Sequence, residues 1–169
     1  MGNDLSQEVR ITTLQRVPFF GGISEGVIAS LLERATIVER AGGEYFFEQG
    51  DSGTSAFVLE RGEVAILRRY EEKEHALRTL GTGDCFGEVA LLDFGARSAS
   101  VKAISDCQAI ELTGTDILSV LSIDCQQFAM IYMNLGREIG RRLREADERL
   151  FKAQFSEHGV ADGWRFGSG

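Results

Sequence analysis

Short runs of β-type residues, separated by glycines, fill the middle of the chain from Thr36 to about Leu112. These runs lie at residues 56–59, 64–67 and 100–104. Glycines at positions 50, 62, 81 and 83 mark the turns between them. Several short strands at this spacing predict an antiparallel β-sandwich or jelly roll over residues 36–112.

Two turns within this region are predicted in more detail. Arg61 and Gly62 stand between two apolar runs and predict a hairpin turn. The charged segment 71–74 predicts another loop.

Amphipathic helical patterns flank the β region. Apolar residues recur three or four positions apart over residues 4–15 and 25–35. A chain of 169 residues suits one domain. We therefore predict an α+β fold with one domain over residues 1–155, helices within 4–35, the β-sandwich over 36–112, C-terminal helices within 115–155 and a flexible tail over 156–169.

Composition excludes several classes of protein. Hydrophobic residues make up 43% of the chain, which is enough for a core, and the formal net charge is −8. A nucleic-acid surface needs clustered positive charge instead. No apolar stretch approaches the roughly 20 residues that span a bilayer, and the N-terminus lacks the basic start and apolar core of a signal peptide. We expect a cytoplasmic protein without a membrane or nucleic-acid partner.

The sequence contains no pattern typical of catalysis or metal binding. Cys85, Cys107 and Cys125 are widely separated, and no Cys/His spacing suggests a metal or a haem. His75 and His158 have no visible catalytic partner, and no nucleophile stands near a base. We therefore expect no metal, no cofactor and no enzymatic activity.

Residues 86–101 combine side chains that suit a small phosphate-bearing ligand. Gly87 has no Cβ, so a ligand can approach the backbone there, and the short apolar run that follows predicts one or two helical turns with free amides at their start. Arg97 offers a charged planar fork for phosphate oxygens, and Glu88 only accepts hydrogen bonds, which suits a sugar hydroxyl. Together they predict a nucleotide monophosphate pocket, with the ligand-binding residues Phe86, Gly87, Glu88, Val89, Ala90, Arg97, Ser98 and Ala99.

A second interpretation of this segment needs no ligand. Glu88 and Arg97 would then form a buried ion pair with each other beneath a loop. Such a pair is hard to sustain, because attraction in a dry site rarely offsets the desolvation of both partners without further hydrogen bonds.

The same segment resembles the phosphate-binding cassette of the cyclic nucleotide-binding domains found in the catabolite activator protein, kinase regulatory subunits and cyclic-nucleotide-gated channels. Their shared pattern is Phe-Gly-Glu, two or three apolar residues, a short loop, then Arg-Ser/Ala-Ala and a strand. The resemblance extends from Leu5 to about Phe155, and we expect a stand-alone, bacterial-type member of this family. It implies that Glu88 binds the ribose 2′-hydroxyl and Arg97 the cyclic phosphate.

A long helix is predicted from Asp124 to Phe155, where no proline interrupts the sequence. Its apolar stripe consists of Phe128, Tyr132, Leu135, Ile139, Leu143, Ala146 and Leu150. At about 1.5 Å per residue the helix reaches roughly 45 Å, more than a small sandwich covers. The resemblance implies that residues 132–150 form a homodimer, with Gly136 and Gly140 allowing close approach. The alternative is a helix that folds back over its own domain.

In the family this helix also acts as a lid over the base. When Arg141-Arg142-Leu143 is aligned with the similar triplet of the catabolite activator protein, the hydroxyl pair that contacts adenine there falls on Ala146 and Asp147. We expect Arg144 and Asp147 to contact the base. Ser98 matches the catabolite activator protein and favours cAMP as the ligand, with cGMP as the alternative.

The expected function is that of a regulatory sensor in signal transduction. The long helix, with a hinge near residues 121–124, would transmit binding to an unidentified effector protein. A scaffold that keeps the fold but binds no nucleotide is the alternative. A phosphodiesterase is not expected, because metal ligands and a base are missing from the pattern.

Overall fold

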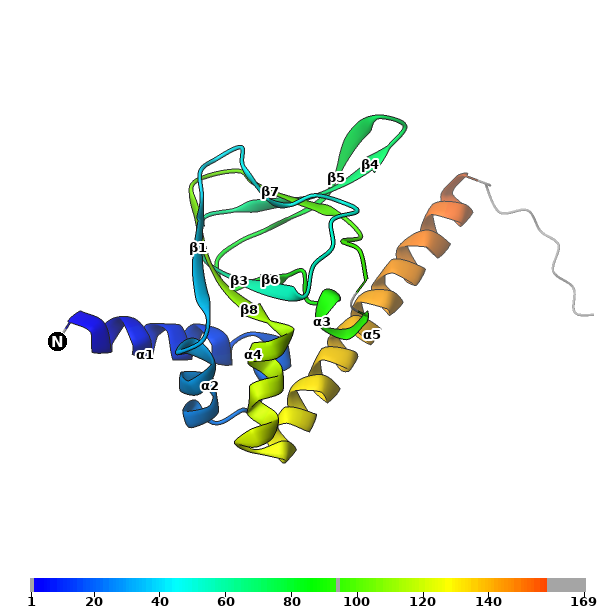
Figure 1. Cartoon of the computed structure of the whole chain (residues 1–169). Helices are drawn as coiled ribbons and strands as arrows, with labels where there is room; N and C mark the ends of the chain where they lie inside the picture. Colours follow the sequence, from blue (N-terminus) through cyan, green and yellow to red (C-terminus); the bar gives the residue numbers. More distant parts are fainter. Residues whose placement is uncertain (1, 94, 158–169) are drawn as a thin grey trace, which may run out of the picture.

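Two antiparallel sheets of four strands each form the body of the molecule (Figure 1). The computed structural model describes residues 2–93 and 95–157. The first sheet has the order β1 (Thr36–Arg40), β8 (Cys107–Thr113), β3 (Ser55–Arg61) and β6 (Cys85–Phe86), and the second the order β2 (Tyr45–Phe47), β7 (Ser100–Ala103), β4 (Val64–Tyr70) and β5 (Lys73–Leu80). The predicted jelly-roll sandwich is confirmed.

Apolar side chains of both sheets meet in the interior of the sandwich. Phe57 and Phe86 lie opposite each other on β3 and β6, and Phe46 comes from β2. The centroids of the three rings lie 5.1 to 5.6 Å apart. Because Phe86 is the last residue of β6, this aromatic cluster fixes the point at which residues 87–99 leave the sheet.

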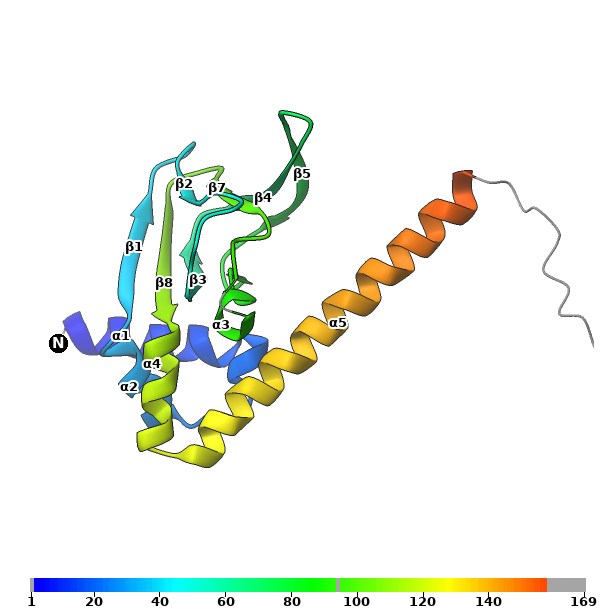
Figure 2. The same cartoon turned by 45° about the vertical axis from the view of Figure 1, so that its right-hand side comes forward.

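The helices build a second core at one end of the sandwich (Figure 2). Phe19, Phe20 and Leu135 are among its buried residues. The helical elements are α1 (Gly2–Gln15), η1 (Pro18–Phe20), α2 (Glu25–Leu32), α3 (Ala90–Asp93), α4 (Gly114–Ser119), η2 (Val120–Ser122) and α5 (Cys125–Glu157). The predicted helix over 25–35 ends at residue 32, and none of the described helices is long and apolar enough to cross a membrane.

The helix α5 divides into two halves. Its first half packs on the domain's own helices: Ile131 and Leu135 are buried, and Asn134 Nδ2 donates to Gly21 O at 2.8 Å. Its second half runs along and past the sandwich (Figure 2). Leu143 and Leu150 in this half are exposed. Among residues 2–93 and 95–157, the domain therefore covers the apolar stripe mainly at its N-terminal end.

The prediction of a flexible tail over 156–169 falls almost entirely outside the described residues. Residues 156 and 157 belong to α5, which therefore passes the predicted helix end at 155.

One predicted turn is wrong, and one predicted loop is shorter than expected. The Arg61-Gly62 turn joins β3 and β4, which lie in different sheets, so it is a crossing between sheets and not a hairpin. Gly62 has φ of 95°, and a Cβ there would lie 2.6 Å from Asp106 O. The predicted 71–74 loop is only a turn at Glu71 and Glu72, because Lys73 already begins β5. The strand escaped prediction since nearly all of its residues are exposed and it lacks an apolar alternation.

The helix α4, which follows the last strand of the sandwich, has a capped N-terminus. Thr113 Oγ1 accepts from Asp116 N at 3.2 Å, and Asp116 Oδ2 accepts from Thr113 N at 2.8 Å. This reciprocal capping box satisfies amides that the first turn of α4 leaves free.

We expect Thr113→Ala to lower the free energy of unfolding by about 1 kcal/mol, because the side-chain acceptor of the box is lost. Urea denaturation followed by circular dichroism measures this change. Thr113→Ser keeps the acceptor and should stay within about 0.5 kcal/mol of the wild type. Equal loss in both variants would contradict a capping role.

Candidate ligand-binding pocket

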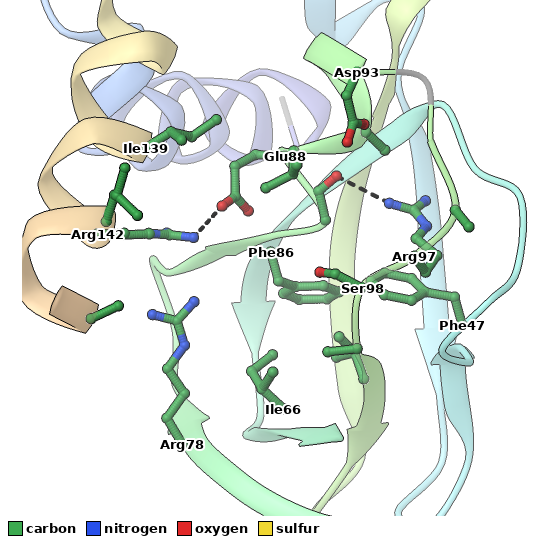
Figure 3. Close-up of a pocket in the computed structure, with 18 residues that line it drawn as sticks. Phe47, Ile66, Arg78, Phe86, Glu88, Asp93, Arg97, Ser98, Ile139 and Arg142 are labelled. Atoms are coloured by element: carbon green, nitrogen blue, oxygen red, sulfur yellow. Dashed lines mark hydrogen bonds and ion pairs between the residues drawn. The ribbon is translucent and has the colours of Figure 1, made fainter. Parts of the chain in front are cut away.

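A cavity of about 510 Å³ lies between the sandwich, the segment 87–99 and α5 (Figure 3). All eight residues predicted for ligand binding line it, so the structure brings them together. The full lining is Phe47, Ile66, Arg78, Phe86, Gly87, Glu88, Val89, Ala90, Asp93, Ala96, Arg97, Ser98, Ala99, Val101, Ile139, Arg142, Leu143 and Ala146.

The guanidinium of Arg97 is buried at one end of the cavity. Its Nη1 donates to Ser55 O at 2.8 Å and to Gly87 O at 3.0 Å, and its Nη2 donates to Ser55 Oγ at 3.2 Å. The ring of Phe47 lies 4.0 Å from its Cζ. Buried Nε has no hydrogen-bond partner in the described part of the chain. A charged donor group is thus held in place with hydrogen-bonding capacity left over.

No carboxylate among the described residues forms an ion pair with Arg97. Burial lowers the pKa of its guanidinium, while the more distant carboxylates of Glu111, Asp51 and Glu88 act in the opposite direction. Even so, an arginine remains charged in a protein. The direct Glu88–Arg97 pair that a ligand-free interpretation requires is not formed, and this end of the cavity suits an anion.

Two glycines give the Arg97 side chain its space. Gly87 has φ of +76°, and a Cβ there would lie 2.7 Å from Arg97 Nη1 and 3.2 Å from the ring of Phe47. A Cβ on Gly53 would lie 2.3 Å from Arg97 Nε. The backbone on both sides of the guanidinium is therefore as close as glycine allows.

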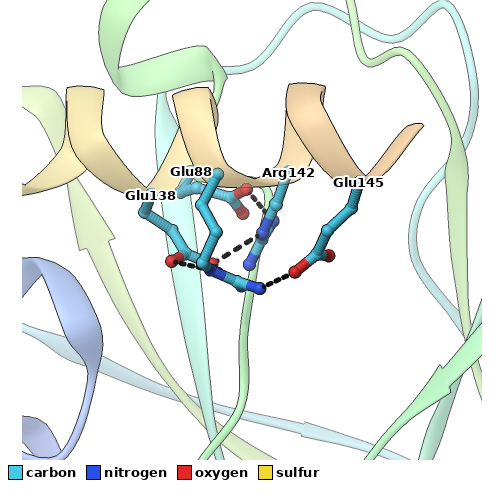
Figure 4. A network of polar contacts seen from close by, with 5 residues as sticks. Glu88, Glu138, Arg142 and Glu145 are labelled. Carbon is cyan, nitrogen blue, oxygen red and sulfur yellow. Dashed lines mark hydrogen bonds and ion pairs between the residues drawn. The ribbon is translucent and has the colours of Figure 1, made fainter. Parts of the chain in front are cut away.

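Glu88 lies near α5, and its side chain is buried. Arg142 Nη1 donates to Glu88 Oε1, while Arg142 Nε donates to Glu138 Oε1 at 2.9 Å (Figure 4). Glu88 and Glu138 are only 3% and 7% exposed. One arginine thus joins a carboxylate of the pocket to a carboxylate of the helix, and we call these three residues the latch.

Further arginine contacts support the helix side of the latch. Arg141 Nε donates to Glu138 Oε2 at 2.9 Å, and Arg141 Nη1 donates to Glu145 (Figure 4). The hydrogen bond from Arg141 holds the pKa of Glu138 below its usual value, and Arg142 adds to this effect against the opposing effect of burial. Glu138 is therefore ionised at neutral pH and holds Arg142 toward the cavity.

The two predicted base contacts do not reach the cavity. Arg144 and Asp147 are exposed, and neither lines the cavity. The helix instead contributes Ile139, Arg142, Leu143 and Ala146. Each residue turns an α-helix by about 100°, so the positions following Leu143 and Ala146 face away.

The sequence identified neither Arg142 nor Arg78 as a residue of the pocket. Arg142 forms ion pairs with Glu88 of the pocket and with Glu138 of α5. It stands three residues after Ile139 and four before Ala146, so its place on the apolar stripe was a usable signal. Arg78 lies in a highly charged strand, where no pattern separates it from its neighbours.

The arrangement can hold a ligand with an anionic end and a hydroxyl-bearing middle. Arg97 offers charge-assisted donors at one end, and Glu88 Oε2 forms no hydrogen bond with any described residue. The apolar floor comes from Ile66, Phe86 and Val101. Within residues 2–93 and 95–157 no three His, Cys, Asp or Glu side chains are grouped to hold a metal ion.

Comparison with known proteins gives a consistent result. The sequence model of the family described as "Cyclic nucleotide-binding domain" matches residues 37–124. The chain is 36% identical over 116 residues to "Cyclic AMP receptor protein" of Thermus thermophilus, covering 68% of this chain and 52% of that protein. It is 33% identical to "cGMP-dependent protein kinase, isozyme 1" of Drosophila melanogaster, covering 58% of this chain and 13% of the kinase. The chain therefore spans about half the length of the first relative and far less of the second.

Solved structures agree on the fold. The catabolite activator protein of Thermus thermophilus superposes with a TM-score of 0.72 at 33% identity, over 83% of this chain and 64% of that one. A cyclic nucleotide-binding domain from Methylobacillus flagellatus reaches a TM-score of 0.76 over 89% of this chain and 85% of the other. At 19% identity, the second comparison supports the fold alone.

The latch predicts energetic coupling between Glu88 and Arg142. Glu88→Gln and Arg142→Met should each destabilise the protein, and the double variant should lose less than the sum by about 1 to 3 kcal/mol. The reason is that removing one partner leaves the other charge buried and poorly paired. Urea denaturation of the four proteins measures the coupling.

Arg137→Met provides the matched control. Arg137 is exposed on the same helix and donates to Asn134 at 3.0 Å, away from Glu88. Combined with Glu88→Gln it should be additive to within about 0.5 kcal/mol. A Glu88–Arg142 coupling no larger than this control would show that the latch has no energetic role.

Proposed function

The chain belongs to the cyclic nucleotide-binding domain family, and on this premise we propose that it is a regulatory sensor that binds a purine nucleoside cyclic monophosphate and does not transform it. The observation that carries this proposal is the buried guanidinium of Arg97, which retains an unpaired Nε and has no carboxylate partner among the described residues. A cyclic phosphate carries one negative charge and exposed oxygens, so it supplies the charge and the acceptor that this group lacks.

The ribose hydroxyl is assigned to Glu88. Its Oε1 accepts from Arg142, which leaves Oε2 to accept from a hydroxyl. A carboxylate is an acceptor only, whereas the 2′-hydroxyl is a donor that every cyclic ribonucleotide carries. Glu88 and Arg97 line the same cavity, so one ligand can reach both.

The cavity has the right size for such a ligand. Its volume of about 510 Å³ lies within the usual range for small-molecule sites. A nucleotide of about 22 heavy atoms at roughly 0.3 kcal/mol per atom gives about 7 kcal/mol, which corresponds to micromolar binding. An affinity of this order suits a second messenger.

Signalling is assigned to α5 through the latch. A ligand that forms a hydrogen bond with Glu88 or Arg142 changes the contacts that hold α5 beside the cavity. The segment between α4 and α5, residues 120–124, is the hinge in this proposal. Binding shifts the position of the helix only as far as the ligand's affinities for the two positions differ.

The partners follow from the same helix. Leu143 and Leu150 of its second half are exposed in the described part of the chain, and we assign residues 132–150 to a homodimer interface. A separate effector protein then responds to the helix. One relative is named for cyclic AMP and another for cGMP, so these names do not single out one base.

Calorimetric titration of nucleotide-free protein tests the function. The wild type should bind cAMP, cGMP or both with micromolar or lower Kd, and chromatography should recover the nucleotide unchanged. Arg97→Gln should weaken binding roughly 10-fold to 100-fold, because it removes charge-assisted hydrogen bonds to the phosphate. Circular dichroism establishes that the variant is folded.

Arg61→Gln is the control for this charge change, since Arg61 is exposed at the end of β3 and does not line the cavity. It should leave both Kd values unchanged. Absence of heat with either nucleotide in folded wild-type protein would favour a scaffold that binds no nucleotide. Recovery of a hydrolysed product would indicate an enzyme.

The dimer is tested at Gly136. A Cβ at this exposed position meets nothing within 4 Å in the chain, so Gly136→Leu should not disturb the monomer. We expect sedimentation equilibrium to give the dimer mass for the wild type and the monomer mass for Gly136→Leu. Gly26→Leu, at an equally open helical position away from α5, should remain dimeric. A monomeric wild type at tens of micromolar would refute the interface.

A further inference from the structure

A second arginine of the sandwich points into the cavity, away from the Arg97 end (Figure 3). Arg78 comes from the middle of β5, and its guanidinium lies toward Arg142 and the α5 side of the cavity. It forms no hydrogen bond or ion pair with any residue that the structure describes. The other charged side chains of the cavity all have partners. Glu88 pairs with Arg142, and Arg97 donates to backbone carbonyls. Asp93 Oδ1 accepts from Gly95 N at 3.0 Å, so Arg78 is the charged side chain of the cavity whose donors are all available to a ligand.

Apart from Glu88 Oε2, which the proposed function assigns to the ribose hydroxyl, the side chains that line the cavity on the side of α5 supply donors and apolar surface but no free acceptor. Ile66, Leu143 and Ala146 are apolar, and Arg142 is a donor already engaged with Glu88 and Glu138. Arg78 is an exposed residue of β5, but partial desolvation and the nearby charge of Arg142 lower its pKa, while Glu88 acts in the opposite direction; this agrees with two cations facing the same space. The group that lies there in the complex must therefore accept hydrogen bonds.

This requirement separates the two purine bases. The outer edge of guanine presents two acceptors, N7 and O6, whereas the same edge of adenine presents the N7 acceptor and the N6 amino donor. The arginine fork carries donors only and matches the guanine edge with two hydrogen bonds. Adenine would place its amino group against a cation.

We propose that Arg78 reads the base by donating to O6 and N7 of guanine, so that the chain prefers cGMP to cAMP. This inference rests on the proposed function, because it requires the phosphate at Arg97 and the ribose at Glu88. It reverses the preference for cAMP that Ser98 suggested. Asp147, which the sequence predicted as a base contact, is not in the cavity.

Titration with three nucleotides tests the proposal. The wild type should bind cGMP about 10-fold to 100-fold more tightly than cAMP, as expected for one bidentate base contact. Inosine cyclic monophosphate keeps O6 and N7 but lacks the 2-amino group, and it should bind like cGMP. Arg78→Met should bring the Kd values of all three nucleotides close to that of cAMP.

Arg78→Gln sharpens the test, because a glutamine amide offers one donor and one acceptor and so matches adenine N7 and N6. This variant should bind cAMP at least as tightly as cGMP. Arg68→Met removes the same charge from the same hairpin at an exposed position outside the cavity, and it should keep the wild-type preference.

The outcomes separate the two proposals. Equal Kd values for cGMP and cAMP in the wild type, or tighter binding of cAMP, would overturn the role of Arg78 and leave the cyclic nucleotide sensor intact. An equal weakening of all nucleotides by Arg78→Met would also overturn it, because that result indicates a general electrostatic effect. Absence of binding by any nucleotide to folded protein would overturn the sensor and the base preference together.

Discussion

A permanently charged guanidinium buried among backbone carbonyls is the constraint on which the pocket depends. Removing an ion from water costs several kcal/mol, and Arg97 recovers this through Ser55 O, Gly87 O and the face of Phe47. The two carbonyls belong to the start of β3 and the segment after β6, whose pairing brings Phe57 opposite Phe86. The register between β3 and β6 therefore also fixes the position of the Arg97 charge. An anion would accept a hydrogen bond from the donor of Arg97 that the carbonyls leave free.

The latch extends this arrangement from the sandwich to the long helix. Arg142 lies between two buried carboxylates, one on each side of the boundary between the pocket and α5. A further group that hydrogen-bonds to one of these two carboxylates changes how the carboxylates share the hydrogen bonds of Arg142. In the proposed mechanism a ribose hydroxyl is that group, and the helix that carries Glu138 also carries the uncovered surface assigned to the dimer. A local change in hydrogen bonding can then alter a surface far from the ligand.

The inferred base preference depends on which residues of α5 face the cavity. Asp147 follows Ala146 directly in the sequence, yet the turn of the helix places only Ala146 on the cavity. The α5 side thus offers adenine's amino group no free acceptor, while the exposed strand β5 supplies Arg78 from the opposite side. Donors outnumber acceptors where the base would lie, and this imbalance is the physical basis of the inferred preference for guanine.

The sequence by itself determined the sandwich, the flanking helices and the eight cassette residues that line the cavity, because these depend on local pattern: strand and helix periodicity, glycine turns and a contiguous motif. Only the tertiary structure decided the partners of the charges. Glu88 pairs with Arg142, 54 residues away, and not with Arg97. Packing between separate segments likewise decides the crossing at Gly62, the pairing of β5 and the position of Arg78. Apart from Arg142, which stands on the apolar stripe of α5, the charged side chains show no periodicity that predicts which of them turn inward, because this is set by packing between elements distant in the chain.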